Sequence, residues 1–149
     1  MDGDIYWIDV TWDDSYVEET GTERLTHKYF LIDDEMLYRT RQVSGDYELP
    51  VPECDTLKQN WYVVHGDYIE GYSPDEIDRR ISAHLADRII DVKFSDKASY
   101  ESCVDGLFAA RADGSAGLFE LDSFRGKTAT ASYYTDEKAF TLIVEFDIS

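Results

Sequence analysis

The sequence predicts an α+β fold in one compact domain, and three observations lead to this prediction. Segments with the two-residue alternation of strands occupy both ends of the 149-residue chain, and two segments with helical periodicity lie between them. Apolar residues make up 43% of the chain and aromatic residues 14%, which is enough for a packed core. No Gly/Ser-rich or Pro-rich linker divides the sequence, so we expect residues 1–149 to form a single domain.

The N-terminal part predicts an antiparallel meander followed by a loop. Residues 4–12 alternate, with Tyr6, Ile8, Val10 and Trp12 on one face and Ile5 and Trp7 on the other. Residues 33–35 are a short acidic run that predicts a tight turn, and the prolines within residues 44–55 favour a loop. The strand patterns of this part lie at residues 4–12, 25–32, 36–43 and 60–66.

The middle of the chain predicts two helices with a short strand, residues 89–94, between them. Ser73 can cap the first helix, Pro74 suits the first helical position, and Glu76 follows the cap by three residues. Ser95 or Asp96 caps the second helix, and Gly114 is a suitable stop. The apolar stripes are Ile77, Ile81, His84, Leu85 and Ile89 on the first helix, and Tyr100, Cys103, Val104, Leu107 and Phe108 on the second.

The C-terminal part predicts an antiparallel three-stranded meander over residues 117–124, 128–134 and 139–148. The connections at residues 125–127 and 135–138 are short enough for hairpins. In the last strand, alternate apolar residues predict one buried face formed by Phe140, Leu142, Val144, Phe146 and Ile148.

The charge of the chain is its most unusual property. With 32 acidic and 14 basic residues the net charge is −18, and the first 23 residues contain eight acids and no base. Direct binding to nucleic acid or to an anionic membrane is disfavoured, because Lys and Arg make most contacts to phosphates. A basic protein partner is favoured instead. We find neither a signal-peptide pattern nor an apolar run near 18 residues, and we therefore expect a cytoplasmic protein.

None of the short motifs in the sequence indicates a chemistry, so we predict no catalytic residue, no cofactor and no metal. Gly126-Lys127-Thr128 matches the end of a phosphate-binding loop, but Leu121 stands where its first glycine should be. Residues 113–120 resemble the end of a calcium loop, but Ala109 and Arg111 stand at ligand positions. The three histidines, His27, His65 and His84, form no zinc-ligand spacing, and Cys54 with His65 is only a weak thiol–imidazole candidate.

A partner-binding face is the candidate site that the sequence favours. Aromatic residues supply much contact area at low entropic cost, and carboxylates can occupy positions that normally receive phosphates. Such residues gather in the first strand, and a second acidic cluster lies at residues 33–35. The predicted partner-binding residues are Tyr6, Trp7, Asp9, Trp12, Asp13, Asp14, Tyr16, Glu18, Glu19, Asp33, Asp34 and Glu35.

The leading functional hypothesis is a small, acidic, non-enzymatic inhibitor that occludes a basic, nucleic-acid-binding surface of a target protein. It would be a phage-type nucleic-acid mimic, such as an anti-restriction or anti-CRISPR protein, or an immunity protein to a nuclease toxin. One alternative is a salt-adapted small enzyme or ligand-binding domain whose acidic surface is only an adaptation to salt and has no role in function. Another is an acidic scaffold subunit of a larger complex. The sequence leaves the oligomeric state open.

Overall fold

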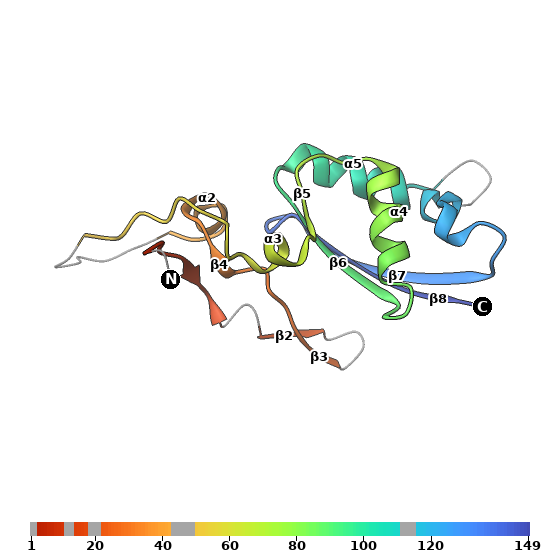
Figure 1. Ribbon diagram of the computed structural model, residues 1–149, viewed down its shortest axis with the longest axis horizontal. Helices are drawn as coiled ribbons and strands as arrows, with labels where there is room; N and C mark the ends of the chain where they lie inside the picture. Colours follow the sequence, from red (N-terminus) through yellow and green to blue (C-terminus); the bar gives the residue numbers. More distant parts are fainter. Residues whose placement is uncertain (1–2, 11–13, 18–21, 43–49, 111–115) are drawn as a thin grey trace. The chain divides into compact units, whose positions relative to one another are not determined.

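The computed structural model describes residues 3–10, 14–17, 22–42, 50–110 and 116–149, without the side chains of residues 14–17 and 22–25. The chain divides into two compact units, unit 1 (Met1–Gly66) and unit 2 (Asp67–Ser149), and we describe each by itself (Figure 1). The predicted α+β class is confirmed by the helices and sheets of the described residues. A single domain over residues 1–149 stays a prediction.

Unit 2 is built on a four-stranded mixed sheet in the order β5-β6-β8-β7. β5 (Tyr68–Ile69) runs parallel to β6 (Ile89–Phe94), whereas β8 (Thr141–Ile148) is antiparallel to both β6 and β7 (Ala129–Asp136). Helix α4 (Pro74–Ala83) lies in the connection between the two parallel strands. Parallel strands need a long crossover connection, which is usually a helix. Helices α4 and α5 (Lys97–Phe108) cover one face of the sheet (Figure 1).

The core of unit 2 lies between that sheet face and the helices. The predicted α5 stripe is confirmed, because Tyr100, Cys103 and Leu107 are buried and Val104 and Phe108 pack beside them. The predicted face of the last strand is confirmed as well, since all five of its residues belong to the core or pack against it. Gly106 permits a close approach here, because a Cβ at this position would lie 2.6 Å from the Tyr72 hydroxyl.

Both predicted helix starts in unit 2 are confirmed by their cap hydrogen bonds. Ser73 Oγ accepts from the Glu76 amide at 3.2 Å, and Asp96, rather than Ser95, caps α5 through the Ser99 amide at 2.8 Å. α4 is shorter than predicted, because it ends at Ala83, so His84 is its C-cap and Leu85 lies beyond the helix. α5 ends at Phe108, and the predicted stop at Gly114 lies outside the described residues.

The predicted strand at residues 117–124 is wrong. This segment forms two 3₁₀ helices, η1 (Gly117–Glu120) and η2 (Asp122–Phe124). Leu118, Leu121 and Phe124 are buried, and their spacing of three residues matches the three-residue turn of a 3₁₀ helix. The predicted three-stranded C-terminal meander is therefore a β7–β8 hairpin, and the other neighbour of β8 is β6 from the middle of the chain.

The described residues of unit 1 include two short two-stranded sheets and the short helices α2 (Asp34–Tyr38) and α3 (Trp61–His65). β1 (Trp7–Ile8) pairs with β4 (Phe30–Ile32), and β2 (Asp14–Val17) pairs with β3 (Thr22–Leu25), both antiparallel. The predicted N-terminal meander is thus correct only in having short antiparallel pairs, and most of its strand boundaries are wrong.

The predicted long strands of unit 1 are broken at identifiable positions. Within residues 4–10, the described part of the predicted strand, β1 consists of Trp7 and Ile8 alone. Leu31 adopts a left-handed conformation (φ 55°) and interrupts the register of the partner strand β4. Ile8 and Val10, which were predicted to share one face of that strand, are 49% and 70% exposed. Residues 25–32 are divided by a turn, in which the Phe30 amide donates to the His27 carbonyl.

The predicted turn at residues 33–35 and the strand at 36–43 are wrong because a helix begins there. Asp33 Oδ1 accepts from the Met36 amide at 2.8 Å, and Asp34 and Glu35 lie in the first turn of α2, where the helix dipole favours acids. The same error occurs at residues 60–66. Asn60 caps α3, and Gly66 ends it with a left-handed φ of 77° that suits glycine.

Asn60 connects α3 to β4. Its side-chain oxygen accepts from the Tyr62 amide at 3.2 Å, and its Nδ2 donates to the carbonyl of Phe30 at 3.1 Å, with a longer contact of 3.4 Å to that of Leu31. The side chain is fully buried, so these bonds compensate its loss of water. One polar residue therefore both starts a helix and holds the irregular end of a strand.

Candidate partner-binding surface

Asp34 is the predicted site residue with the most internal contacts. Its Oδ1 accepts from the indole Nε1 of Trp7 at 2.6 Å, and its Oδ2 accepts from the Cys54 amide at 3.3 Å. Its own amide donates to the Cys54 carbonyl at 2.8 Å. This carboxylate therefore ties β1 and the segment around Cys54 to the start of α2.

Replacing Asp34 with alanine should lower the free energy of unfolding by about 2–3 kcal/mol, because each hydrogen bond to a charged group contributes about 1.5–3 kcal/mol and the second one here is long. Urea unfolding followed by tryptophan fluorescence measures this loss, and Trp7 should report it directly. The matched control is Glu35→Ala, since Glu35 is an exposed neighbour that pairs with Arg39 one turn away, at 2.7 Å. Equal effects of the two substitutions would contradict a connecting role for Asp34.

Asp9 is also engaged within unit 1. Its Oδ2 accepts from Arg41 Nε at 3.0 Å, and its amide donates to the Tyr29 carbonyl at 3.1 Å. The Arg41 guanidinium lies 4.8 Å from the centre of the Tyr29 ring, in a cation–π arrangement. Asp9 thus holds the cation that covers a buried tyrosine.

The structure brings together only some of the predicted partner-binding residues. Trp7 and Asp34 are in contact, Asp33 caps α2, and Glu35 is exposed on the first turn of that helix. Tyr6 is half-buried, and no group among the described residues bonds its buried hydroxyl. Asp14 and Tyr16 lie in β2 without described side chains. Trp12, Asp13, Glu18 and Glu19 lie outside the described residues, so the complete face stays a prediction.

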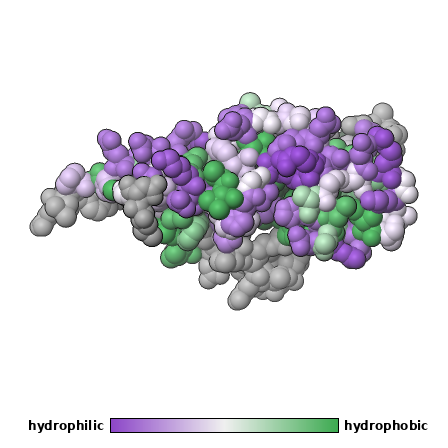
Figure 2. Space-filling view, in the orientation of Figure 1, coloured by the Kyte–Doolittle hydropathy of each residue, from purple (hydrophilic) through white to green (hydrophobic). Residues whose placement is uncertain are grey.

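Most of the exposed large apolar side chains among the described residues lie in unit 1. Val63 and Val64 of α3 are 36% and 58% exposed, and Figure 2 shows an apolar patch over this helix on a mostly hydrophilic surface. Sequence reasoning missed them, because it assigned residues 60–66 to a strand. The exposed apolar residues of unit 1 are Ile5, Ile8, Val10, Phe30, Tyr38, Val51, Val63 and Val64. Exposed apolar side chains beside many carboxylates are the elements of a protein-binding surface.

A second feature that the sequence did not reveal is a stack of three rings. The Trp61 ring lies 4.4 Å from the His27 ring and 4.4 Å from the His65 ring, centre to centre. His65 Nδ1 also lies 2.8 Å from the Trp61 carbonyl, one turn earlier in α3. The sequence offered one indication of the Trp61–His65 contact, because residues four apart lie side by side on the surface of a helix.

The burial of His27 predicts that the stability of the protein depends on pH. Burial is the main reason that the pKa of His27 is lowered; the nearby charge of His65 lowers it further, and a hydrogen bond to the Thr26 backbone opposes both. Between this lowered pKa and about 6.5 the unfolded chain binds more protons at His27 than the folded chain does. The stability contributed by His27 is therefore present above about pH 6.5 and is lost as the pH falls below it.

We expect the free energy of unfolding to decrease between about pH 8 and about pH 6, with a smaller decrease in His27→Phe. Phenylalanine keeps a ring against Trp61 but cannot titrate. The measurement is urea unfolding of both proteins at both pH values. The change in free energy of unfolding with pH is then compared between them, because groups that the two proteins share contribute equally to it. An identical pH dependence in both would contradict the assignment to His27.

The cysteines do not have the environment of a nucleophile. The pKa of the Cys54 thiol is raised by burial and then by the negative charges of Asp34, Asp33 and Asp55. Burial raises the pKa of Cys103 to about 12. Since the thiolate is the reactive form, both thiols should be inert in the folded protein. No cluster of three metal-ligating side chains occurs in the described ranges.

Unit 2 contains a pocket of about 320 Å³ with an acidic lining. Two of its carboxylates have local partners, because Asp78 accepts from the Ser123 amide at 2.8 Å and Asp122 pairs with Arg125 at 2.5 Å. The carboxyl-bearing residues that line it are Asp75, Asp78, Glu120 and Asp122. If the protein were an enzyme or a ligand-binding domain, this pocket would be a candidate site for its ligand.

Comparison with known proteins adds no family to these observations. No protein-family model matches the chain, and no curated protein is significantly similar to it. None of the helices in the described ranges combines the length and the hydropathy that crossing a bilayer requires.

Proposed function

We propose that this protein is a small acidic inhibitor that binds a basic protein and covers the surface with which that protein binds nucleic acid. One observation carries the proposal. Each arginine whose side chain is described already pairs with a carboxylate, so the positive charge of the chain is largely used internally. These residues are Arg39, Arg41, Arg79, Arg80, Arg88 and Arg125.

The surplus acids set the electrostatic field of the surface. Residues 1–66 contain 15 acids and 5 bases, and residues 67–149 contain 17 acids and 9 bases. Unit 1 has the larger surplus and also most of the exposed apolar side chains. Long-range attraction would speed encounter with a basic groove, and apolar and aromatic contacts would then hold the complex. Inhibition requires no catalysis, cofactor or metal, because occupancy of the groove is sufficient.

The target is a nucleic-acid-binding protein or a nuclease. A phage-type mimic, such as an anti-restriction or anti-CRISPR protein, and an immunity protein would use the same physics against different targets. We infer a cytoplasmic location, where such targets and reduced thiols coexist. In this proposal Asp34 and Asp9, which are bonded within unit 1, would support the face, and Glu35 with the acids of residues 13–19 would contact the partner.

The test is capture of the partner from the native host's lysate by the tagged protein at low salt. The proposal predicts one main nucleic-acid-binding protein that rising salt releases and that added DNA or RNA displaces. A partner that salt releases but nucleic acid does not displace would indicate a scaffold subunit instead.

Measuring stability at increasing salt concentration distinguishes the inhibitor from the salt-adapted enzyme. A salt-adapted enzyme would be poorly folded in dilute buffer and would gain strongly from molar KCl, because its self-repulsion needs screening. The inhibitor should already be folded in dilute buffer, and circular dichroism at low and high KCl distinguishes these outcomes.

A further inference from the structure

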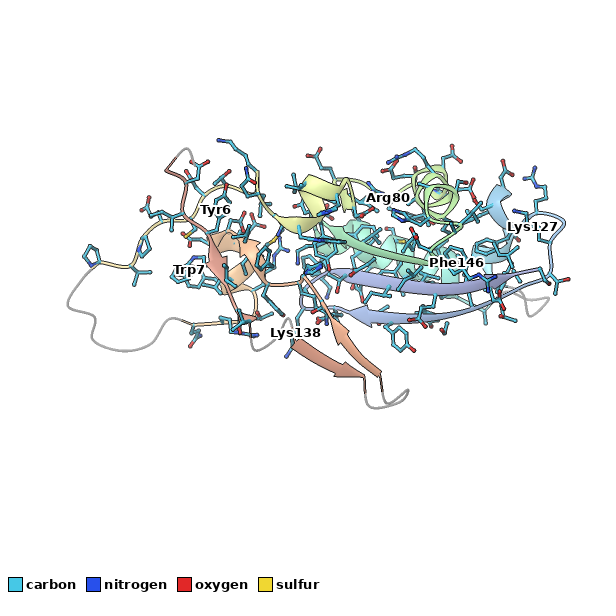
Figure 3. All side chains as sticks on the ribbon, turned by 60° about the horizontal axis from the view of Figure 1, so that its bottom comes forward. Tyr6, Trp7, Arg80, Lys127, Lys138 and Phe146 are labelled. Atoms are coloured by element: carbon cyan, nitrogen blue, oxygen red, sulfur yellow. The ribbon has the colours of Figure 1, made fainter. Side chains whose placement is uncertain are left out.

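A small pocket at one end of unit 2 differs chemically from the rest of the protein. Its volume is about 200 Å³, and Leu85, Arg88, Lys127, Phe146 and Ile148 line it. Two of these five residues are basic and none is acidic, in a chain with 32 acids and 14 bases. Figure 3 shows Lys127 and Phe146 at the same end of unit 2.

The backbone positions Arg88, and the Lys127 side chain bonds a backbone carbonyl. Arg88 has a left-handed φ of 59°, and its carbonyl accepts from the Phe146 amide at 2.9 Å. Lys127 Nζ donates to the Ser123 carbonyl at 2.8 Å. Because an ammonium group has three N–H donors, this one bond leaves Lys127 able to donate to a ligand.

The remaining wall of the pocket is apolar. Phe146 is buried and Ile148 is half-buried beside the core, whereas Leu85 is 38% exposed. Leu85 is exposed because α4 ends at Ala83, before the residue can join the apolar stripe of the helix. An apolar chain in the pocket would cover Leu85 and remove that surface from water.

We propose that this pocket binds a small monocarboxylate with a short apolar chain, whose carboxylate lies between Arg88 and Lys127. Both cations can donate charge-assisted hydrogen bonds to a carboxylate, and the apolar chain would contact Leu85, Phe146 and Ile148. The volume is below the range of pockets for drug-sized ligands, so the ligand is small. The site lies wholly within unit 2 and is independent of the proposed partner-binding function.

Asp147 competes with such a ligand for Arg88. Its Oδ1 lies 2.6 Å from Arg88 Nη1, and both side chains are more than 60% exposed. An exposed ion pair of this kind contributes little stability, so a bound carboxylate can replace it. Neutralising Asp147 should therefore strengthen binding, which a purely structural role of the pair would not do.

The test titrates the full chain with hexanoate and follows the methyl signals of Leu85 and Ile148 by NMR. We expect saturable shifts with a Kd on the order of 1 mM, about tenfold weaker binding in Lys127→Gln, and several-fold tighter binding in Asp147→Asn. Asp105→Asn is the control, because it makes the same change in net charge at an exposed position of α5.

Two further probes identify what the pocket recognises. Hexanol has the same chain without the charge and should bind at least about tenfold more weakly than hexanoate. A short peptide that ends in a leucine carboxylate should also bind more weakly, because the pocket is too small for more than its last side chain. Equal binding of hexanol, tighter binding of the peptide, or no effect of Lys127→Gln would each overturn the proposal.

Discussion

Arg80→Ala is expected to lower the free energy of unfolding by about 3–5 kcal/mol, because it leaves a buried carboxylate without its cation. Arg80 Nη1 donates to Asp67 Oδ1 at 3.0 Å, and the two side chains are only 5% and 11% exposed. Arg80 Nη2 donates to the Tyr68 carbonyl at 3.2 Å and to Glu76 Oε1 at 2.7 Å. One guanidinium thus connects α4 to the start of β5; Figure 3 labels Arg80.

The neighbouring Arg79 provides the matched control. It lies on the same helix and pairs with the same Glu76 at 2.8 Å, but its side chain is 63% exposed. Arg79→Ala should therefore cost less than about 1 kcal/mol. Urea unfolding should be followed by far-UV circular dichroism, because all three tryptophans lie in unit 1. Equal losses in the two variants would show that burial of the Asp67–Arg80 pair does not matter.

Reversal of the acids at positions 13, 14, 18 and 19 to lysine is expected to abolish binding to the captured partner. The change is eight charge units, from −18 to −10, concentrated in the stretch with the highest acid density. Like charges would then face each other across the interface, at a cost of several kcal/mol, so we expect a Kd at least on the order of 1000-fold weaker. Surface plasmon resonance at two salt concentrations measures the loss and its electrostatic origin.

A control variant with the same net charge tests whether position matters. Four exposed acids of unit 2 can be reversed instead, namely Glu70, Asp87, Asp105 and Glu137. The proposal predicts that this variant associates more slowly but keeps most of its affinity, because only the long-range field has changed. If both variants lose binding equally, the partner responds to net charge and the proposed face is wrong.

The structure of unit 2 was easier to predict than that of unit 1, because its helix caps and strand periodicity are visible in short stretches of sequence. The cap at Ser73, the acid at Asp96 and the alternation in β8 each act within one or two turns or along one strand, so a single sequence carries them. In unit 1 the apolar pairs of α3 resembled a strand, and only Asn60 and Gly66 at its ends indicated a helix. Short helices are not stable alone, so the capping contacts decide them.

The candidate site shows the same division. The sequence located the acidic and aromatic residues, but it could not show that Trp7 and Cys54 bond Asp34, or that Arg41 bonds Asp9. These partners are 20 or more residues apart in the chain, so no spacing rule connects them. The sequence also could not show that Arg88 and Lys127 line one pocket. They come together because β8 pairs with both β6 and β7, which are far apart in the chain.

The sequence by itself determined the negative charge, the α+β class and the principal elements of unit 2, because composition, helix caps and strand periodicity are local properties. Only the tertiary structure decided which carboxylates remain available to a partner. Asp33, Asp34 and Asp9 look equivalent to Glu35 in the sequence, yet these three are partly buried and bond an amide, an indole or a guanidinium within unit 1. Glu35 is exposed and pairs with Arg39 one helical turn away. Partial burial makes those bonds costly to lose, because a partly desolvated polar group without its partner destabilises the fold.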